Sequence, residues 1–236
     1  MPAQVVLIPG MLCDDAIWQY QLPMLSDYDV HLIDIRHCQH LSQIADTIQQ
    51  KITFPFHLIG FSLGGMAAFE VIRKISKQVQ SLTLISTQYS SLNIDVRNKL
   101  EQCYTLCLRD ATIYQRYIEG NSKAYFKNQK IPHQQAYIDM MERVGMSIGL
   151  QQMKLILTMP EQPFPDVTCP TLIIHGKEDY RCNLENQEYL CEQIPHVKLI
   201  EIENAAHFVL WEQADAVNRE ILSHLTLQGS EDRVKL

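Results

Sequence analysis

Short runs of apolar residues recur along the chain, separated by stretches in which apolar residues keep a helical spacing. The runs are rich in β-branched side chains, which suits strands buried on both faces of a parallel sheet. Six stand out, at 5–8, 30–34, 56–60, 82–86, 171–175 and 197–202. Helical periodicity marks residues 16–25, 41–51, 63–75, 184–194 and 208–225. This alternation predicts an α/β fold with an open, mostly parallel sheet flanked by helices.

One interval breaks the rhythm, because about eighty residues separate the fourth apolar run from the fifth. Apolar residues keep a helical spacing there too, from Val96 to Cys107 and from Tyr137 to Val144. We therefore predict a helical cap at 88–165, inserted into a core formed by 1–87 and 166–227, with a flexible tail at 228–236. The cap holds five of the nine methionines, which suit either a soft wall of a binding pocket or packing against the core.

Composition narrows the class of partner. The chain has 236 residues, of which 46% are hydrophobic, and a formal net charge of −7 without a basic block. This balance disfavours nucleic acid and anionic membranes as partners, so we expect a small-molecule substrate. Seven cysteines without a metal-ligand spacing indicate reduced thiols in the cytoplasm, and no metal or other cofactor is expected. The apolar run at 5–8 is too short for a signal peptide, and no run is long enough to cross a membrane.

The sharpest local signal is a Gly-x-Ser-x-Gly pentapeptide at 60–64, centred on Ser62. Small residues two positions before and after a serine allow a strand to turn abruptly into a helix, which leaves the hydroxyl exposed on a strained backbone. The pattern alone is weak, because residues 145–149 repeat it around Ser147. Only Ser62 lies between a predicted strand and a predicted helix. We interpret the second match as a break between cap helices.

A serine hydroxyl needs a base within hydrogen-bond reach, and that base needs an orienting acid. Two carboxylates, Glu178 and Asp179, follow the fifth predicted strand, and His207 follows the sixth. These positions lie at the carboxyl ends of neighbouring strands, where open α/β sheets build their sites. The order serine, acid, histidine is also the order expected for this architecture. From the residues alone, Glu178 and Asp179 both stay candidates for the acid.

Together these segments resemble the α/β-hydrolase fold superfamily, especially its small-capped bacterial esterase-like members. The resemblance covers nearly the whole chain and includes the loop at 7–11, the motif around Ser62, the segment 170–179 and the surroundings of His207. It implies that Ser62 is the nucleophile, His207 the general base and Asp179 its orienting acid. It also implies that the backbone N–H groups of Met11 and Leu63 form the oxyanion hole.

The chain departs from the usual pattern of that superfamily in ways that leave the reacting groups in place. Pro9-Gly10 stands where many relatives have His-Gly after the first strand, and Ala206 replaces a glycine before the histidine. A histidine and cysteine cluster at 37–40 looks metal-like, but it supplies no tetrahedral ligand set, so we interpret it as a surface loop.

The resulting hypothesis is a serine hydrolase that cleaves a small carboxylic ester or thioester through an acyl-enzyme on Ser62. Two alternatives stay open. One is a carbon-carbon lyase or hydrolase of the same fold, similar to the synthases of quinone biosynthesis, for which an arginine-rich pocket would be the sign. The other is a ligand-binding homologue that has lost turnover.

Overall fold

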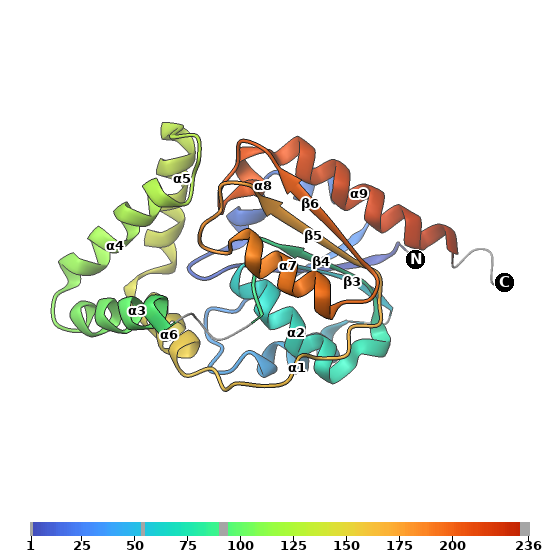
Figure 1. Cartoon of the computed structure of the whole chain (residues 1–236), viewed down its shortest axis with the longest axis horizontal. Coiled ribbons are helices and arrows are strands. Elements are labelled where there is room, and N and C mark those ends of the chain that lie inside the picture. The colour runs from blue at the N-terminus through green and yellow to red at the C-terminus, as the bar shows by residue number, and fades with distance from the viewer. Residues whose placement is uncertain (1, 53–54, 90–93, 232–236) are drawn as a thin grey trace.

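A parallel sheet forms the centre of the molecule. The computed structural model describes residues 2–52, 55–89 and 94–231. Within them, six parallel strands are arranged in the order β2-β1-β3-β4-β5-β6 (Figure 1). The strands are β1 (Gln4–Ile8), β2 (Asp29–Leu32), β3 (Phe56–Phe61), β4 (Val79–Ile85), β5 (Thr171–Gly176) and β6 (Val197–Ile202). The fold class predicted from the sequence is confirmed.

Helices cover both faces of the sheet. Those outside the insertion are α1 (Ser42–Lys51), α2 (Leu63–Ile75), α7 (Leu184–Gln193), α8 (Val209–Glu212) and α9 (Ala214–Glu231). Successive strand residues point to opposite faces. Val5 and Leu7 of β1 join one buried cluster with residues of α9, whereas Val6 and Ile8 join a second with residues of α1, α2 and α7. Burial on both sides explains why the strand segments are continuously apolar.

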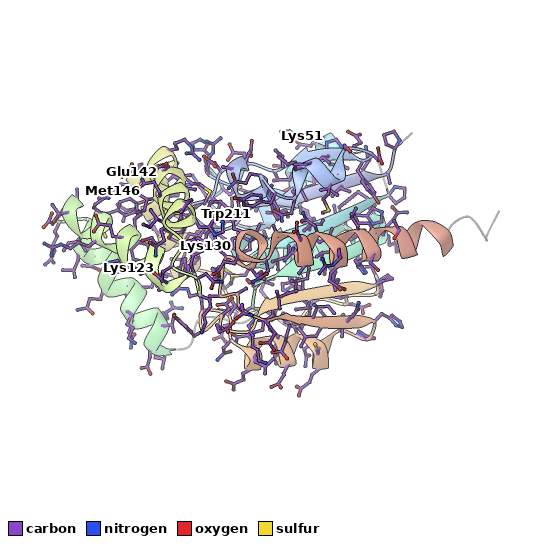
Figure 2. The ribbon with its side chains drawn as sticks, turned by 90° about the horizontal axis from the view of Figure 1, so that it is seen from above. Lys51, Lys123, Lys130, Glu142, Met146 and Trp211 are labelled. Atoms are coloured by element: carbon purple, nitrogen blue, oxygen red, sulfur yellow. The ribbon has the colours of Figure 1, made fainter. Side chains whose placement is uncertain are left out.

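Four further helices occupy the chain between β4 and β5, so the insertion predicted there is confirmed. They are α3 (Ile94–Cys107), α4 (Ala111–Ala124), α5 (Ile131–Val144) and α6 (Met146–Leu157). They stand to the left of the sheet in Figure 1. Seen from above, Trp211 lies where this cap meets the core (Figure 2). Tyr137 and Met140 of α5 belong to the same buried cluster as Val5, so the cap is packed onto the core. The domain boundaries at 88 and 165 stay a prediction.

One predicted helix is wrong. Residues 16–25 form two short 3-10 turns, at Asp15–Trp18 and Leu22–Leu25, instead of a continuous helix. Pro23 gives the physical reason, since it has no N–H to donate to the carbonyl of residue 19 and its ring would clash there.

The carboxyl-terminal helix is longer than predicted. It continues to residue 231, so the first residues of the predicted flexible tail are helical. The rest of that tail, 232–236, lies outside the described residues. Among the helices of the described ranges, none combines the length and apolar character needed to span a bilayer.

Candidate active site

Ser62 lies on a sharp turn between the end of β3 and the start of α2. Its backbone has φ 51° and ψ −114°, a combination that is costly for a residue with a Cβ. Two hydrogen bonds hold the turn in place: the Ser62 N–H donates to the Ile85 carbonyl at 2.9 Å, and Thr87 Oγ1 donates to the Ser62 carbonyl at 2.7 Å.

The two glycines of the motif are required by close packing. A Cβ on Gly60 would lie 2.5 Å from the carbonyl oxygen of Gly64, and a Cβ on Gly64 would lie 2.1 Å from that of Ile8. Both obstacles are backbone atoms that cannot rotate away. The glycines of the motif are therefore there because the turn has no room for a larger side chain at either position.

Loops at the carboxyl ends of β5 and β6 bring a carboxylate and an imidazole to this serine. His207 Nε2 lies 3.1 Å from Ser62 Oγ, and His207 Nδ1 lies 2.9 Å from Asp179 Oδ2. The imidazole and the carboxylate are both buried. The three side chains, up to 145 residues apart in sequence, form one hydrogen-bonded chain.

The surroundings of Asp179 favour its ionised form. Its Oδ1 accepts from the backbone N–H groups of Arg181 at 2.8 Å and Cys182 at 3.0 Å. Burial opposes ionisation, yet His207 and these two N–H groups hold the pKa of the Asp179 carboxyl below its usual value. An ionised carboxylate only accepts hydrogen bonds, so Nδ1 of His207 is the donor in this contact, and Nε2 is the ring nitrogen that faces Ser62.

Glu178 and Ser147, the other candidates for the acid and the nucleophile, lie outside this hydrogen-bonded chain. Glu178 Oε2 accepts from the Ala205 N–H at 3.1 Å, and its other oxygen lies 3.7 Å from Lys127 Nζ. Ser147 is exposed in the first turn of α6, after Gly145, whose φ of 83° joins α5 to α6. The interpretation of 145–149 as a break between cap helices is confirmed.

Two backbone N–H groups flank the serine. Met11 and Leu63 both line the cavity that contains Ser62 and His207. Leu63 is the first residue of α2, where N–H groups have no acceptor within the helix. In the described part of the chain, neither N–H has a hydrogen-bond acceptor.

A cap side chain supports the loop that carries Met11. Leu12 has a positive φ of 59°, and its N–H donates to Oε1 of Gln152, a buried residue of α6, at 2.7 Å. The next loop residues are also tied to the cap, because Arg143 Nε donates to Asp14 Oδ2 at 2.8 Å. Asp14 also caps the 3-10 turn that follows, since its side chain accepts from the Ala16 N–H at 3.0 Å.

The cavity over Ser62 has a volume of about 590 Å³, enough for a small organic substrate. Aromatic rings form the wall around the imidazole: the ring centroids of Tyr125 and Phe61 lie 5.0 and 5.4 Å from that of His207. Tyr137 and Met141 of the cap also line it, so cap residues serve both core packing and the pocket wall.

A metal site is poorly supported by the donors present. Among the described residues, the only cluster with metal-ligand spacing is Asp179, Cys182 and His207. Burial raises the pKa of the Cys182 thiol well above its usual value, which disfavours a thiolate ligand. The other two side chains already bind each other.

Sequence reasoning missed three residues around the site. Arg181 lines the cavity, Gln152 holds the loop after β1, and Glu212 accepts from the Ala206 N–H at 2.8 Å and the Asn128 N–H at 2.7 Å. Glu212 thereby joins the histidine loop to the cap. Arg181 gave a signal by its position two residues after Asp179, and Glu212 lies in the segment after His207 that carries the family resemblance, but the sequence assigned a role to neither. No motif marks Gln152.

The family comparison covers most of the chain. A family model described as "Alpha/beta hydrolase family" matches residues 5–220. Among solved structures, an esterase (EaEST) from Exiguobacterium antarcticum superposes with a TM-score of 0.79 at 19% identity and covers 96% of this chain and 93% of that one. At this identity the likeness shows the fold alone.

Curated relatives match either locally or distantly. A proline iminopeptidase, PfmaB, of Pestalotiopsis fici is 37% identical over 59 residues, 25% of this chain and 21% of its own. A pimeloyl-[acyl-carrier protein] methyl ester esterase of Methylococcus capsulatus is 34% identical over 91 residues, 35% of this chain and 36% of its own. The enzyme of the same name from Vibrio atlanticus is 20% identical across 93% of both chains. The first two matches thus span about a fifth and a third of those relatives.

Proposed function

The chain belongs to the alpha/beta hydrolase family, and from this premise we propose that it is a serine hydrolase that cleaves a small carboxylic ester or thioester. The observation that carries the proposal is the hydrogen-bonded chain from Ser62 through His207 to Asp179, which opens onto a cavity of about 590 Å³. The relatives named as esterases support ester hydrolysis. The acyl-enzyme and the role of each residue are our proposal.

In the first half of the reaction, Ser62 Oγ attacks the carbonyl carbon while its proton passes to His207 Nε2. The carbonyl electron pair moves onto oxygen, and the N–H groups of Met11 and Leu63 bind the resulting oxyanion. Each such donor is worth about 3 to 4 kcal/mol of transition-state stabilisation. Asp179 stabilises the imidazolium that forms.

In the second half, the tetrahedral intermediate collapses and the bond to the leaving group breaks. The imidazolium of His207 returns its proton to the departing alcohol or thiol, which leaves an acyl ester on Ser62. Water then attacks this ester and gives up a proton to His207, and Ser62 Oγ leaves with that proton. The products are the acid and the free enzyme.

The two Gly-x-Ser-x-Gly matches provide a matched pair of variants that tests the nucleophile. We expect Ser62→Ala to lower the hydrolysis of p-nitrophenyl acetate by at least about 10⁴-fold and to abolish covalent labelling by a fluorophosphonate. Ser147→Ala, which changes an exposed cap residue, retains both activities. Full labelling of the Ser62→Ala protein would contradict the proposal.

The acid is tested by a second pair. Asp179→Asn should reduce kcat about 10³- to 10⁴-fold, because an amide disturbs the tautomer and orientation of His207. Glu178→Gln removes the neighbouring carboxylate, which contacts Ala205 and Lys127 instead, and should change kcat by less than about 10-fold. The reverse ranking would assign the acid to Glu178.

The two rival functions make different predictions. A lyase of the same fold would be favoured by an arginine-rich pocket, and among the described residues Arg181 is the one arginine that lines the cavity. A lyase would give neither a burst of p-nitrophenol nor acylation of Ser62. A ligand-binding homologue would hydrolyse no ester in a broad panel.

We further propose that the protein acts in the cytoplasm. The seven cysteines support this, because all of them carry free thiols and four are buried. Cell fractionation with an antibody to the chain tests the location. Recovery from an oxidising compartment would contradict it.

A further inference from the structure

A positive charge lies inside the cavity that contains the serine and the histidine. Arg181 belongs to the loop between β5 and α7 and is partly buried. Its guanidinium carbon lies 6.0 Å from the centroid of the Tyr125 ring, which is itself 5.0 Å from the centroid of His207. The cation is therefore at most about 11 Å from the imidazole.

No direct ion pair is formed by this charge within the described residues, although the nearby Asp179 carboxylate contributes to raising the pKa of Arg181. The acid nearest in sequence, Asp179, uses both oxygens for His207 and for backbone N–H groups. Tyr125 does not supply a negative charge, because burial raises the pKa of its phenol well above neutrality. Two other acids, Asp95 and Glu185, also line the cavity.

The surroundings of this guanidinium favour its charged form, and no carboxylate of the described residues occupies its donors. The guanidinium is always ionised, and its planar set of donors matches a carboxylate or phosphate. Within the proposed ester hydrolysis, we propose that Arg181 binds a second, anionic group of the substrate, so that the preferred substrates are esters or thioesters carrying a carboxylate or phosphate away from the reacting carbonyl.

The position of the cation limits the length of such substrates. An extended chain advances about 1.2 Å per bond, so about nine bonds span the longest distance that the geometry allows. Half-esters of dicarboxylic acids with four to about eight carbons fall in this range. Preference for the anion should fade once the chain is too long to place both ends at once.

The test compares charged and neutral esters of equal length. Monomethyl esters of succinic to suberic acid are assayed against methyl esters of the matching monocarboxylic acids, and the ratio of the two kcat/KM values is the readout. We expect the wild type to favour the charged ester by about 10- to 100-fold at one or more lengths. Methyl esters that end in phosphate distinguish the two anions.

Two variants on one loop separate a direct contact from a general charge effect. Arg181→Met removes the guanidinium but keeps the backbone N–H that binds Asp179, and should bring the ratio close to one. Arg181→Lys should restore part of it. Lys177→Met removes the same charge from an exposed residue of that loop, paired with Glu203, and should leave the ratio as in the wild type.

The outcomes for this inference and for the proposed function are distinct. Fluorophosphonate labelling of Ser62 in every variant shows that the site is formed. If wild type is not labelled and hydrolyses no ester, the proposed function fails. If it is labelled but shows no preference for the charged ester, or if Lys177→Met lowers the ratio as much as Arg181→Met, only the assignment of Arg181 is overturned.

Discussion

The backbone of Ser62 has a positive φ that points its hydroxyl toward His207 and is strained for a residue with a Cβ. Glycine has no Cβ and adopts positive φ readily. We therefore expect Ser62→Gly to have a free energy of unfolding about 1 kcal/mol higher than Ser62→Ala, although both are inactive. Urea denaturation followed by circular dichroism measures the difference.

The same pair of substitutions at Ser147 is the control. This residue lies in α6, where glycine is unfavourable, so Ser147→Gly should be less stable than Ser147→Ala by about 1 kcal/mol. If glycine is more stable than alanine at position 62 but less stable at position 147, the strain lies in the turn at Ser62. If glycine changes the free energy of unfolding in the same direction at both positions, the backbone at Ser62 is not strained.

Among single residues, the sequence predicts those that are marked by their immediate neighbours along the chain. Ser62 follows from its flanking glycines, and His207 from its place after a strand. From the residues alone the choice between Glu178 and Asp179 stayed open, because adjacent residues of one loop differ only in direction, and only the family resemblance favoured Asp179. Arg181 and Gln152 could not be predicted, since their surroundings come from distant segments that no local pattern describes.

At the scale of elements, hydrogen bonds join the cap to the loop after β1 and, through Glu212, to the loop that carries His207. Gln152 of α6 and Arg143 of α5 both bind the loop that follows β1. Glu212 joins the loop of His207 to the segment between α4 and α5. The strands and most helices were predicted because burial on one or two faces leaves a period in the sequence. The segment 16–25 was not, because its apolar spacing is helical while Pro23 prevents the helix.

Substituting Gln152 tests this coupling. Gln152→Met removes the acceptor of the Leu12 N–H and frees the strained loop next to Met11. We expect kcat to fall about 10- to 100-fold with a smaller change in KM, because the loop holds the Met11 N–H that we propose binds the oxyanion. The free energy of unfolding of Gln152→Met should be lower than that of the wild type by about 1 to 3 kcal/mol, because the buried Leu12 N–H loses its acceptor.

The neighbouring residue on the same helix is the matched control. Gln151 is half-buried and donates to the Cys38 carbonyl, away from the loop after β1. Gln151→Met should therefore leave kcat within about 3-fold of the wild type. An equal loss of kcat in both variants would mean that α6 is damaged as a whole, and that Gln152 has no specific role.

At the scale of the whole molecule, the closely packed interior contains titratable groups that the reaction does not use. His175 of β5 is 1% exposed, and burial lowers the pKa of its imidazole despite the nearby carboxylates of Asp179 and Glu201. Burial also lowers the pKa of His133 and His224. In the folded protein these three histidines therefore resist protonation more than a free histidine does.

This arrangement sets the direction of the pH dependence of stability. Below about pH 6.5 the unfolded chain protonates these histidines while the native protein resists, so the unfolded state binds more protons. The free energy of unfolding should therefore decline as the pH falls from 7 to 5, by up to about 1.4 kcal/mol per pH unit for each histidine that stays wholly neutral. Asp179 does not contribute in this window, because its lowered pKa confines its effect to pH values near and below 3.8.

The contribution of His175 can be isolated by comparing slopes. His175→Gln is expected to lower the free energy of unfolding at pH 7 and to flatten its decline between pH 7 and 5, because one group that resists protonation is gone. His40→Gln changes an exposed loop residue and provides the reference slope. Urea denaturation at four pH values between 7 and 5 gives the free energy of unfolding of the wild type and both variants. A decline as steep in His175→Gln as in the wild type would show that this imidazole is protonated equally in the folded and unfolded states, and so that the interior around β5 admits a charge.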